Sequence, residues 1–376
     1  MILRIFVVSI VLVMLGGTVA ARAQEPAFED SSLAVLTVLE DRSAKIAAYP
    51  YAFYTPETEL AVGAGGIVTF FTSKEEADLR PSKVGFGGYY STRKQYKISQ
   101  TTQLFLDRNR WFLLVPLEFG SFVDKYWGVG NTQPDIPEVD YKLDAFTGRI
   151  VLEGPSPVPF VLRDGFVYEF THRDITDTLG NPNLDSTVLG YEGGLTSGLG
   201  VDLVRDSRDH IFWPEAGAYH RLTFLWFDGF LGSDYDYLEW ELDLRRFQKL
   251  SEGQVLAFHF HGHAVGSGAP FYELPALGGG NIMRGYFRGR YRDRYSLAFQ
   301  VEYRRPLWWR LGAVLFAGGG DVFGSEGSEL TWDSLKYSYG VGLRFLFNSR
   351  DRINLRADFG FGQDTSGVYF GLEEAF

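Results

Sequence analysis

The chain has 376 residues, with 16% aromatic residues, 44 glycines, no cysteine and a formal net charge of −11. The lack of cysteine excludes disulfide frameworks, cysteine-ligated zinc and thiol catalysis, and the negative charge disfavours a nucleic-acid partner, because phosphate binding needs many Lys and Arg contacts. Many aromatics and glycines with only 3 methionines favour an all-β protein.

The first expected element is an export signal. Arg4 supplies a short positive region, residues 5–20 (IFVVSIVLVMLGGTVA) are apolar, and an A-x-A cleavage site follows at residues 21–23. An uncleaved membrane anchor is the alternative, but the apolar run is shorter than the roughly 20 residues that a helical span needs. We therefore expect a signal peptide over residues 1–23, cleaved after Ala23, and an exported protein.

The next segment, residues 24–56, is expected to be a short periplasmic stretch. One short helix is predicted over residues 31–49, where apolar positions recur every three to four residues. From about residue 57 the pattern changes to period two. In 293-DRYSLAFQVEYRR-305, apolar and polar side chains alternate, so a strand here has one apolar and one polar face. Residues 235–247 and 352–362 alternate in the same way.

Such strands fit either a soluble sandwich or a transmembrane barrel whose apolar face meets lipid. Their length decides in favour of the barrel, because they exceed the roughly 5–6 residues common in soluble sheets and approach the roughly 9–11 residues that cross a bilayer. The candidate strands lie at 58–71, 83–93, 96–107, 110–122, 140–153, 158–172, 192–206, 217–228, 236–248, 254–265, 293–305, 308–319, 336–347, 352–362 and 366–376.

These are fifteen segments, whereas bacterial single-chain barrels have an even number of strands. We therefore expect 16 strands, with the missing strand between residues 40 and 190. The predicted fold class is all-β, an antiparallel transmembrane β-barrel over residues 57–376.

Five motifs in a fixed order carry a family resemblance. They are 199-LGVDLVRDSRDHIFWPEAGAYHRLTF-224, 270-PFYELPALGGGNIMRGYFRGRYRDRYSLAFQVEYRRPL-307, 316-FAGGGDVFG-324, 337-YSYGVGLRFLF-347 and the final strand 366-SGVYFGLEEAF-376. This succession resembles the C-terminal barrel of the BamA/TamA superfamily of outer-membrane assembly and translocation proteins, also called the bacterial surface antigen family. The resemblance implies a barrel in the outer membrane of a Gram-negative bacterium.

The resemblance also implies that Arg284, Gly285 and Tyr286 belong to a long extracellular loop folded back into the lumen and anchored by the arginine. The glycines at 278–280 suit this path because they allow the chain to turn at positive φ. A guanidinium confined in a polar lumen needs carboxylate partners.

The family's aspartate partner for this arginine falls at Gly318 in this chain, so another carboxylate must replace it. Glu302, on the polar face of its own strand, is the expected partner, and Asp358 is the second candidate. Asp321 is the third, because at three residues from Gly318 it faces the other way unless a bulge intervenes.

The final strand resembles the recognition signal of outer-membrane proteins, with Phe370, Leu372 and Phe376 on one face and Glu374 as a departure from the pattern. The implied partners are outer-membrane lipid, the barrel assembly machinery and periplasmic chaperones during biogenesis, and an unidentified client or periplasmic partner. Family members that assemble or secrete proteins carry POTRA domains, and residues 24–56 offer no room for one, so a member without POTRA domains is expected.

Three histidines, His259, His261 and His263, share one face of the strand around 258-FHFHGH-263. Alternate Cα atoms in a strand are about 7 Å apart, so two imidazoles can converge on a metal, for which histidine is a common ligand. A polar lumenal face explains the same alternation, so we predict neither a metal nor another cofactor.

Three function classes remain open. The favoured one is a barrel that acts in the insertion or translocation of protein or lipid at the outer membrane, without POTRA domains of its own. The second is a passive pore or structural barrel plugged by the Arg-Gly-Tyr loop. The third is a lumenal lipid-modifying enzyme, but the chain lacks a G-x-S-x-G motif, so no enzymatic activity is expected.

Overall fold

The computed structural model describes residues 44–73, 79–132, 139–157, 163–210, 213–348, 353–372 and 374–376. The signal peptide and residues 24–43 lie outside this part of the chain. The described residues form 16 strands in one antiparallel sheet, in which every strand from β2 to β15 pairs with its two neighbours in the chain. The predicted all-β class and the strand number are confirmed. In the described ranges, no helix has the length and apolar character needed to span a membrane.

The strands are β1 (Lys45–Thr55), β2 (Glu59–Phe70), β3 (Ser82–Ser91), β4 (Tyr96–Leu106), β5 (Trp111–Lys125), β6 (Asp140–Pro155), β7 (Arg163–Asp177), β8 (Gly193–Asp206), β9 (Gly217–Phe227), β10 (Tyr237–Ser251), β11 (Gln254–Val265), β12 (Tyr295–Trp308), β13 (Leu311–Phe323), β14 (Lys336–Asn348), β15 (Ile353–Gly362) and β16 (Thr365–Leu372). Two short 3-10 helices, η1 (Gly229–Leu231) and η2 (Phe271–Glu273), lie in connecting loops.

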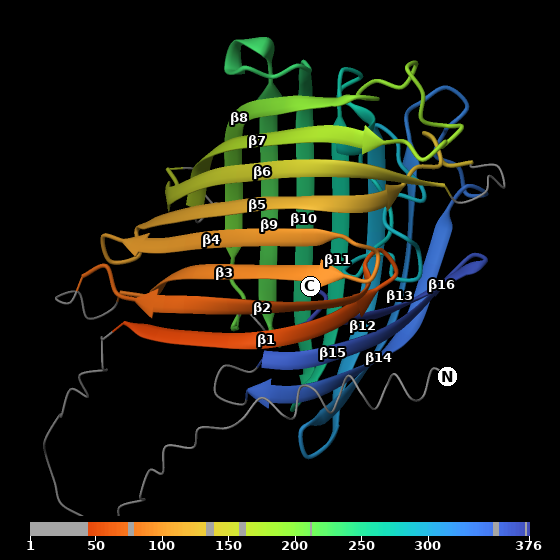
Figure 1. The fold of residues 1–376 in the computed structure, drawn as a ribbon. Helices are drawn as coiled ribbons and strands as arrows, with labels where there is room; N and C mark the ends of the chain where they lie inside the picture. The colour runs from red at the N-terminus through yellow and green to blue at the C-terminus, as the bar shows by residue number, and fades with distance from the viewer. Residues whose placement is uncertain are drawn as a thin grey trace, which may run out of the picture.

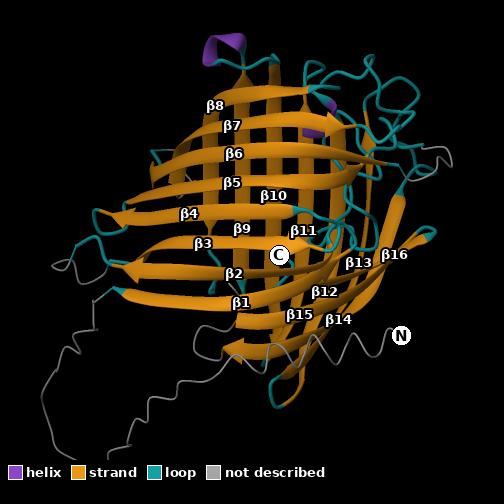
Figure 2. Ribbon diagram, in the orientation of Figure 1, coloured by secondary structure: helices purple, strands orange, loops and turns teal. Residues whose placement is uncertain are grey.

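The strands follow one another around a barrel and enclose a lumen (Figure 1). Short turns close one end, such as those joining β10 to β11 and β12 to β13, and we call this the turn end. Long connections gather at the opposite end, the loop end, as Figure 2 shows in teal. Because β1 starts and β16 finishes at the turn end, the two strands run antiparallel and lie side by side.

The two faces of the sheet have opposite character. In β12, Tyr295 and Phe299 face outward and are 37% and 45% exposed, whereas Gln300 and Glu302 face the lumen and are 2% and 0% exposed. Other outward apolar side chains with large exposed fractions are Val62, Phe86, Ile98, Phe146, Val201, Trp240, Leu315 and Val341. An apolar exterior around a polar interior is the arrangement of a barrel surrounded by lipid and the reverse of a soluble sandwich.

The barrel begins earlier than the sequence analysis expected. β1 starts at Lys45, so the boundary at residue 57 is wrong, and the helix predicted over 31–49 is replaced by strand from residue 45 onward. β1 is the strand that was missing from the fifteen. Pro50 weakens a strand prediction, because proline cannot donate to a central ladder, but β1 is an end strand of the sheet and tolerates it.

The last strand is shorter than expected. β16 ends at Leu372, and Phe376 lies in the lumen with only 6% exposure. Its buried neighbours are Phe247, Val255, Ala257 and Ala375. The prediction that Phe376 shares a strand face with Phe370 is therefore wrong. The physical reason is Glu374, whose carboxylate accepts a 2.7 Å hydrogen bond from Nε of Arg344 in the lumen, so the chain turns inward there.

Candidate functional site

The long loop between β11 and β12, residues 266–294, carries the Arg-Gly-Tyr segment into the barrel. Gly278, Gly279 and Gly285 adopt φ values of +103°, +105° and +114°, which residues other than glycine rarely adopt. The loop packs through a buried apolar cluster against the inner face of β12 and β13. This cluster comprises Leu277, Met283, Tyr286, Ala298 and Val322.

Arg284 is fully buried between the loop and the lumenal wall. Its Nη1 atom lies 2.5 Å from Oδ2 of Asp358 in β15, and its Nη2 atom pairs with Oε1 of Glu302 in β12. The guanidinium also lies over the ring of Phe316 in β13, 3.6 Å from the ring centroid. The structure thus brings Arg284 against two of the three carboxylates named from the sequence.

Further charged side chains extend this cluster toward the turn end. Glu302 also accepts a hydrogen bond from Nε of Arg304 at 3.1 Å, and Asp358 accepts one from Nη1 of Arg344 at 2.5 Å. Both of these arginines also contact Glu374, at 3.8 and 2.7 Å. Each carboxylate therefore has more than one arginine partner, as buried charges require.

The main chain next to Arg284 is bound to the last two strands. The N–H of Gly285 donates to the hydroxyl of Tyr369 at 3.0 Å, and Thr365 donates to the carbonyl of Gly285 at 3.0 Å. A Cβ atom at Gly285 would lie 2.7 Å from the carbonyl carbon of Phe361. This contact leaves no room for a side chain, which explains the glycine after the arginine.

Tyr286 fixes the loop tip to the connection between β15 and β16. Its hydroxyl donates to the carbonyl of Tyr337 at 3.0 Å and accepts from the N–H of Gln363 at 2.9 Å. Tyr286 is 1% exposed, so these hydrogen bonds satisfy a buried hydroxyl. Tyr369 was not named from the sequence, although an aromatic residue at an inward strand position is the available signal. Tyr337 contributes only its main-chain carbonyl, since its side chain is 53% exposed on the outer face.

Gly318 and Asp321 do not supply a partner for Arg284. A Cβ atom at Gly318 would come within 2.6 Å of the carbonyl oxygen of Phe299, so the strand pairing there resists a side chain. Asp321 instead accepts a hydrogen bond from Nζ of Lys336 at 3.2 Å. No register shift occurs between positions 318 and 321, so the bulge that Asp321 needed is missing from this described stretch of β13.

The remaining arginines of the loop have different surroundings. Arg292 is 5% exposed, and its guanidinium donates to the carbonyl oxygens of Phe271 and Lys125 at 3.3 Å each. Arg290 lies over the ring of Trp127, 5.2 Å from the ring centroid. Arg288 is exposed. The tract is thus divided between interior anchors and positions at the loop end.

The loop also carries a buried carboxyl, Glu273 of η2, which lies 2.9 Å from Nη1 of Arg173. Burial raises the pKa of Glu273 above its ordinary value, and the guanidinium of Arg173 acts in the opposite direction. This carboxyl therefore stays protonated to a higher pH than an exposed glutamate does.

The three histidines each face a separate carboxylate. His259 lies 3.1 Å from Asp243, and His261 and His263 lie 3.0 Å from Glu241 and Glu239. Neighbouring imidazole centroids are 6.2 and 6.3 Å apart. Among the described residues, no group of three or more His, Cys, Asp or Glu side chains is arranged to hold a metal. These pairs form a ladder across the inner faces of β10 and β11.

Comparisons with known proteins agree with this architecture. The Omp85 superfamily domain matches residues 157–376. The crystal structure of BamA from Haemophilus ducreyi lacking POTRA domains 1–3 is similar with a TM-score of 0.60 and 12% identity, over 88% of this chain and 70% of that chain. CdiB from Acinetobacter baumannii gives 0.57 and 13%, over 88% of this chain and 59% of that chain. No curated protein matches the sequence.

Proposed function

This chain belongs to the Omp85 superfamily, and on that premise we propose that it acts in the insertion or translocation of protein or lipid at the bacterial outer membrane. The family and the fold make it an outer-membrane β-barrel. The proposal includes no enzymatic activity. It takes outer-membrane lipid and an unidentified client or periplasmic partner as the molecules on which the barrel acts.

The observation that carries the proposal is the junction between β1 and β16. These strands lie side by side, yet among the described residues no hydrogen-bonded ladder joins them, whereas every other pair of neighbouring strands is joined. An unpaired strand edge presents main-chain N–H and C=O groups that can receive another chain. We infer that the edge, rather than the lumen, is the working part of the barrel.

The position of the loop supports the same choice. Arg284 and its carboxylates lie inside the lumen with no exposed side-chain surface. A substrate that followed the lumen would have to break these buried ion pairs, which costs about 3–5 kcal/mol when one partner is removed. Exchange at the β1–β16 edge requires no such step.

Depletion of the protein in its own bacterium tests the proposal. An inventory of outer-membrane proteins and of lipid asymmetry is taken before depletion, after depletion, and after complementation with the wild-type chain. Loss of particular barrels indicates protein insertion, and altered lipid asymmetry indicates lipid transport. If both inventories stay unchanged while the protein is fully depleted, the proposed function is wrong.

A passive pore closed by the Arg-Gly-Tyr loop is the second candidate, favoured by the charged lumenal wall around Arg284 and the His–carboxylate ladder. Conductance of the purified barrel in planar bilayers separates it from the first candidate. For a plugged pore, Arg284→Ala increases conductance and Arg288→Ala, in the same loop but exposed, does not. Such a pore would also leave the depletion inventories unchanged.

Export and assembly complete the proposal. We infer cleavage after Ala23, and N-terminal sequencing of the protein from purified outer membranes then finds Gln24 as the first residue. We also infer that Phe370, Leu372 and Phe376 act in recognition by the barrel assembly machinery, with periplasmic chaperones delivering the unfolded chain. Slow assembly of Phe370→Ala in pulse-chase experiments tests that role.

A further inference from the structure

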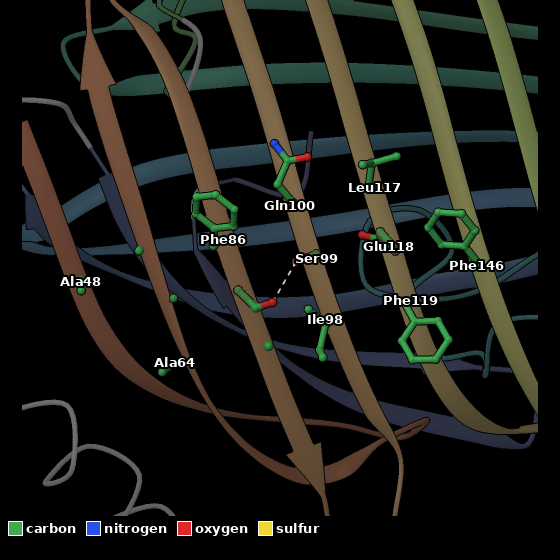
Figure 3. Close-up of a pocket in the computed structure, with 14 residues that line it drawn as sticks. Ala48, Ala64, Phe86, Ile98, Ser99, Gln100, Leu117, Glu118, Phe119 and Phe146 are labelled. Atoms are coloured by element: carbon green, nitrogen blue, oxygen red, sulfur yellow. Dashed lines mark hydrogen bonds between the residues drawn. The ribbon is translucent and has the colours of Figure 1, made fainter. Parts of the chain in front are cut away.

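Three basic side chains interrupt the apolar outer wall of the barrel near its turn end. Elsewhere on this wall, over β3 to β6, Figure 3 shows large apolar side chains around a shallow groove: Phe86, Ile98, Phe119 and Phe146. On the next part of the wall, Arg205 of β8, His220 of β9 and Arg246 of β10 are exposed on the same outer face.

Strand register brings these three side chains together. Arg205 lies directly opposite His220, and Arg246 lies opposite Ala218, the outward position of β9 next to His220. Side chains that are directly opposite have Cβ atoms about 5 Å apart, and diagonal neighbours are about 7–8 Å apart. Because Ala218 is small, the long arginine side chains of the two flanking strands can converge over β9.

The cluster is confined to these three strands. The same two rows of the sheet continue on β11 and β12 with apolar side chains: Phe258, Phe260, Phe299 and Val301. The next outward row toward the loop end is also apolar: Leu203, Leu222 and Leu242. The three basic residues therefore form a local site and not a continuous ring of charge around the barrel.

The charges of the cluster are not balanced within the protein. Asp164 of β7 faces outward one row away, opposite Leu203. Among the residues that the structure describes, no ion pair or hydrogen bond joins an acidic side chain to Arg205, His220 or Arg246. Neighbouring like charges repel one another, and a cation on a lipid-facing wall costs free energy that rises with its depth in the membrane. An anion from the membrane would offset both costs.

We propose that Arg205, His220 and Arg246 bind the phosphate of an anionic phospholipid in the periplasmic leaflet of the outer membrane. The short turns of such barrels face the periplasm. Arg205 is the last but one residue of β8, and Arg246 lies five residues before the end of β10. Long arginine side chains extend along an apolar wall to the level of the headgroups.

The chemistry of the three side chains suits this ligand. A guanidinium donates two N–H groups to the oxygens of one phosphate, and the imidazole of His220 supplies a further N–H donor. A headgroup with net negative charge is favoured over a zwitterionic one, because the cluster repels the ammonium group of the latter. The inference is independent of the proposed function, since a passive barrel binds the same lipid.

Two substitutions and a matched control test the site. Arg205→Gln and Arg246→Gln, made singly and together, remove charge but keep a polar side chain. Arg305→Gln is the control, because Arg305 is also an exposed outward arginine near the turn end, on β12, but it lies opposite Ala313. Each barrel is checked for folding by heat-modifiable mobility on gels, delipidated in mild detergent, and titrated with phosphatidylglycerol or with phosphatidylcholine of the same acyl chains. Native mass spectrometry counts the bound lipid, with and without inorganic phosphate as a soluble competitor.

The wild type and Arg305→Gln are expected to bind phosphatidylglycerol more tightly than phosphatidylcholine and to keep it in the presence of inorganic phosphate. Each single substitution weakens phosphatidylglycerol binding about fivefold, and the double variant binds the two lipids equally. Wild-type binding by the double variant overturns the proposal, as does an equal loss in Arg305→Gln, because the effect would then belong to any arginine near the rim. Displacement of the lipid by an equal concentration of inorganic phosphate also overturns it, since the site would then serve a soluble anion. If the double variant does not fold, the two single variants decide.

Discussion

At the scale of single residues, Arg284 stands out because all of its charge is neutralised within the barrel. Its guanidinium contacts Glu302 in β12, Asp358 in β15 and the ring of Phe316 in β13. One loop side chain thus joins three strands that are not all neighbours in the sheet. A lysine would not reproduce this arrangement, because its single ammonium nitrogen lacks both the two separate Nη donors and the planar face that lies over Phe316.

Arg284→Ala is predicted to destabilise the barrel by about 3 kcal/mol, the low end for removing one member of a buried ion pair. The value is at the low end because Glu302 keeps Arg304 and Asp358 keeps Arg344 as partners. Urea unfolding in detergent micelles measures the change in the free energy of unfolding. Arg288→Ala, in the same loop but exposed, serves as the control and should stay within about 0.5 kcal/mol of wild type.

A double-mutant cycle sharpens this prediction. If the pair Arg284–Glu302 is the anchor, the combined change Arg284→Ala with Glu302→Gln costs less than the sum of the two single changes, by roughly 1–3 kcal/mol. Strict additivity would show that the two side chains do not interact in the folded barrel.

The same scale shows what sequence reasoning reaches and what it misses. Glu302 could be identified because the alternation of apolar and polar residues along its strand is enough to place it on the polar face. The inward course of Phe376 was not identifiable, because it depends on Glu374 meeting Arg344 and Arg304, which lie on distant strands. The alternate spacing of Val368 and Phe370 continues in the sequence as far as Phe376, so the pattern alone does not reveal that the strand ends at Leu372.

Phe376→Ala is predicted to lower the free energy of unfolding by about 3 kcal/mol, as for other buried aromatic side chains. The ring lies 4.8 Å, centroid to centroid, from His259 and 6.3 Å from Phe247, inside the lumen. Phe299→Ala is the comparison, since that ring faces the surrounding lipid and is 45% exposed. A smaller loss at Phe376 than at Phe299 would contradict the lumenal position of Phe376.

At the scale of elements, β1 shows why one strand escaped prediction. Its outward residues include Ala48, Pro50 and Ala52, so the contrast between its two faces is weak. Its more bulky inward residues, Tyr51 and Phe53, pack within the lumen instead of marking an apolar exterior. The strand exists because β2 supplies a ladder along its whole length, and that information is tertiary.

The loop between β11 and β12 supplies the prediction at this scale. Gly285→Ala should release the loop tip, because a Cβ atom there would lie 2.7–2.9 Å from the main chain at Phe361 and Gly362. Gly279→Ala is the matched control, because its φ is also positive, at +105°, but its Cβ would meet only side-chain atoms at 3.7 Å or more. Strain at positive φ costs about 1–3 kcal/mol in both variants.

Limited proteolysis of the folded barrel measures the effect. Cleavage within residues 266–294 is expected to be faster in Gly285→Ala than in Gly279→Ala, because only the former adds a steric clash to the strain. Equal cleavage rates for the two variants would mean that the contact between the loop tip and β15 contributes nothing to holding the loop.

At the scale of the whole molecule, the barrel combines a tightly bonded wall with one weak junction. From β1 to β16 each strand is held by a ladder to the next, and a buried charge cluster ties the loop to β12 and β15. The chain then leaves the sheet after Leu372. The part of the wall that is least held by hydrogen bonds is therefore the place where its two ends meet.

This arrangement predicts uneven hydrogen exchange around the barrel. Half of the N–H groups of a strand point to each neighbour, so those of β1 that face β16 are expected to exchange at least about tenfold faster than amides of β12, which has ladders on both sides. Exchange measured by mass spectrometry on peptides covering β1, β12 and β16, in lipid nanodiscs, gives the comparison. Peptides from β6, another interior strand with two ladders, control for differences in solvent access. Equal protection of β1 and β12 would mean that the two ends of the sheet are joined in the membrane, and the edge would then be closed to an incoming chain.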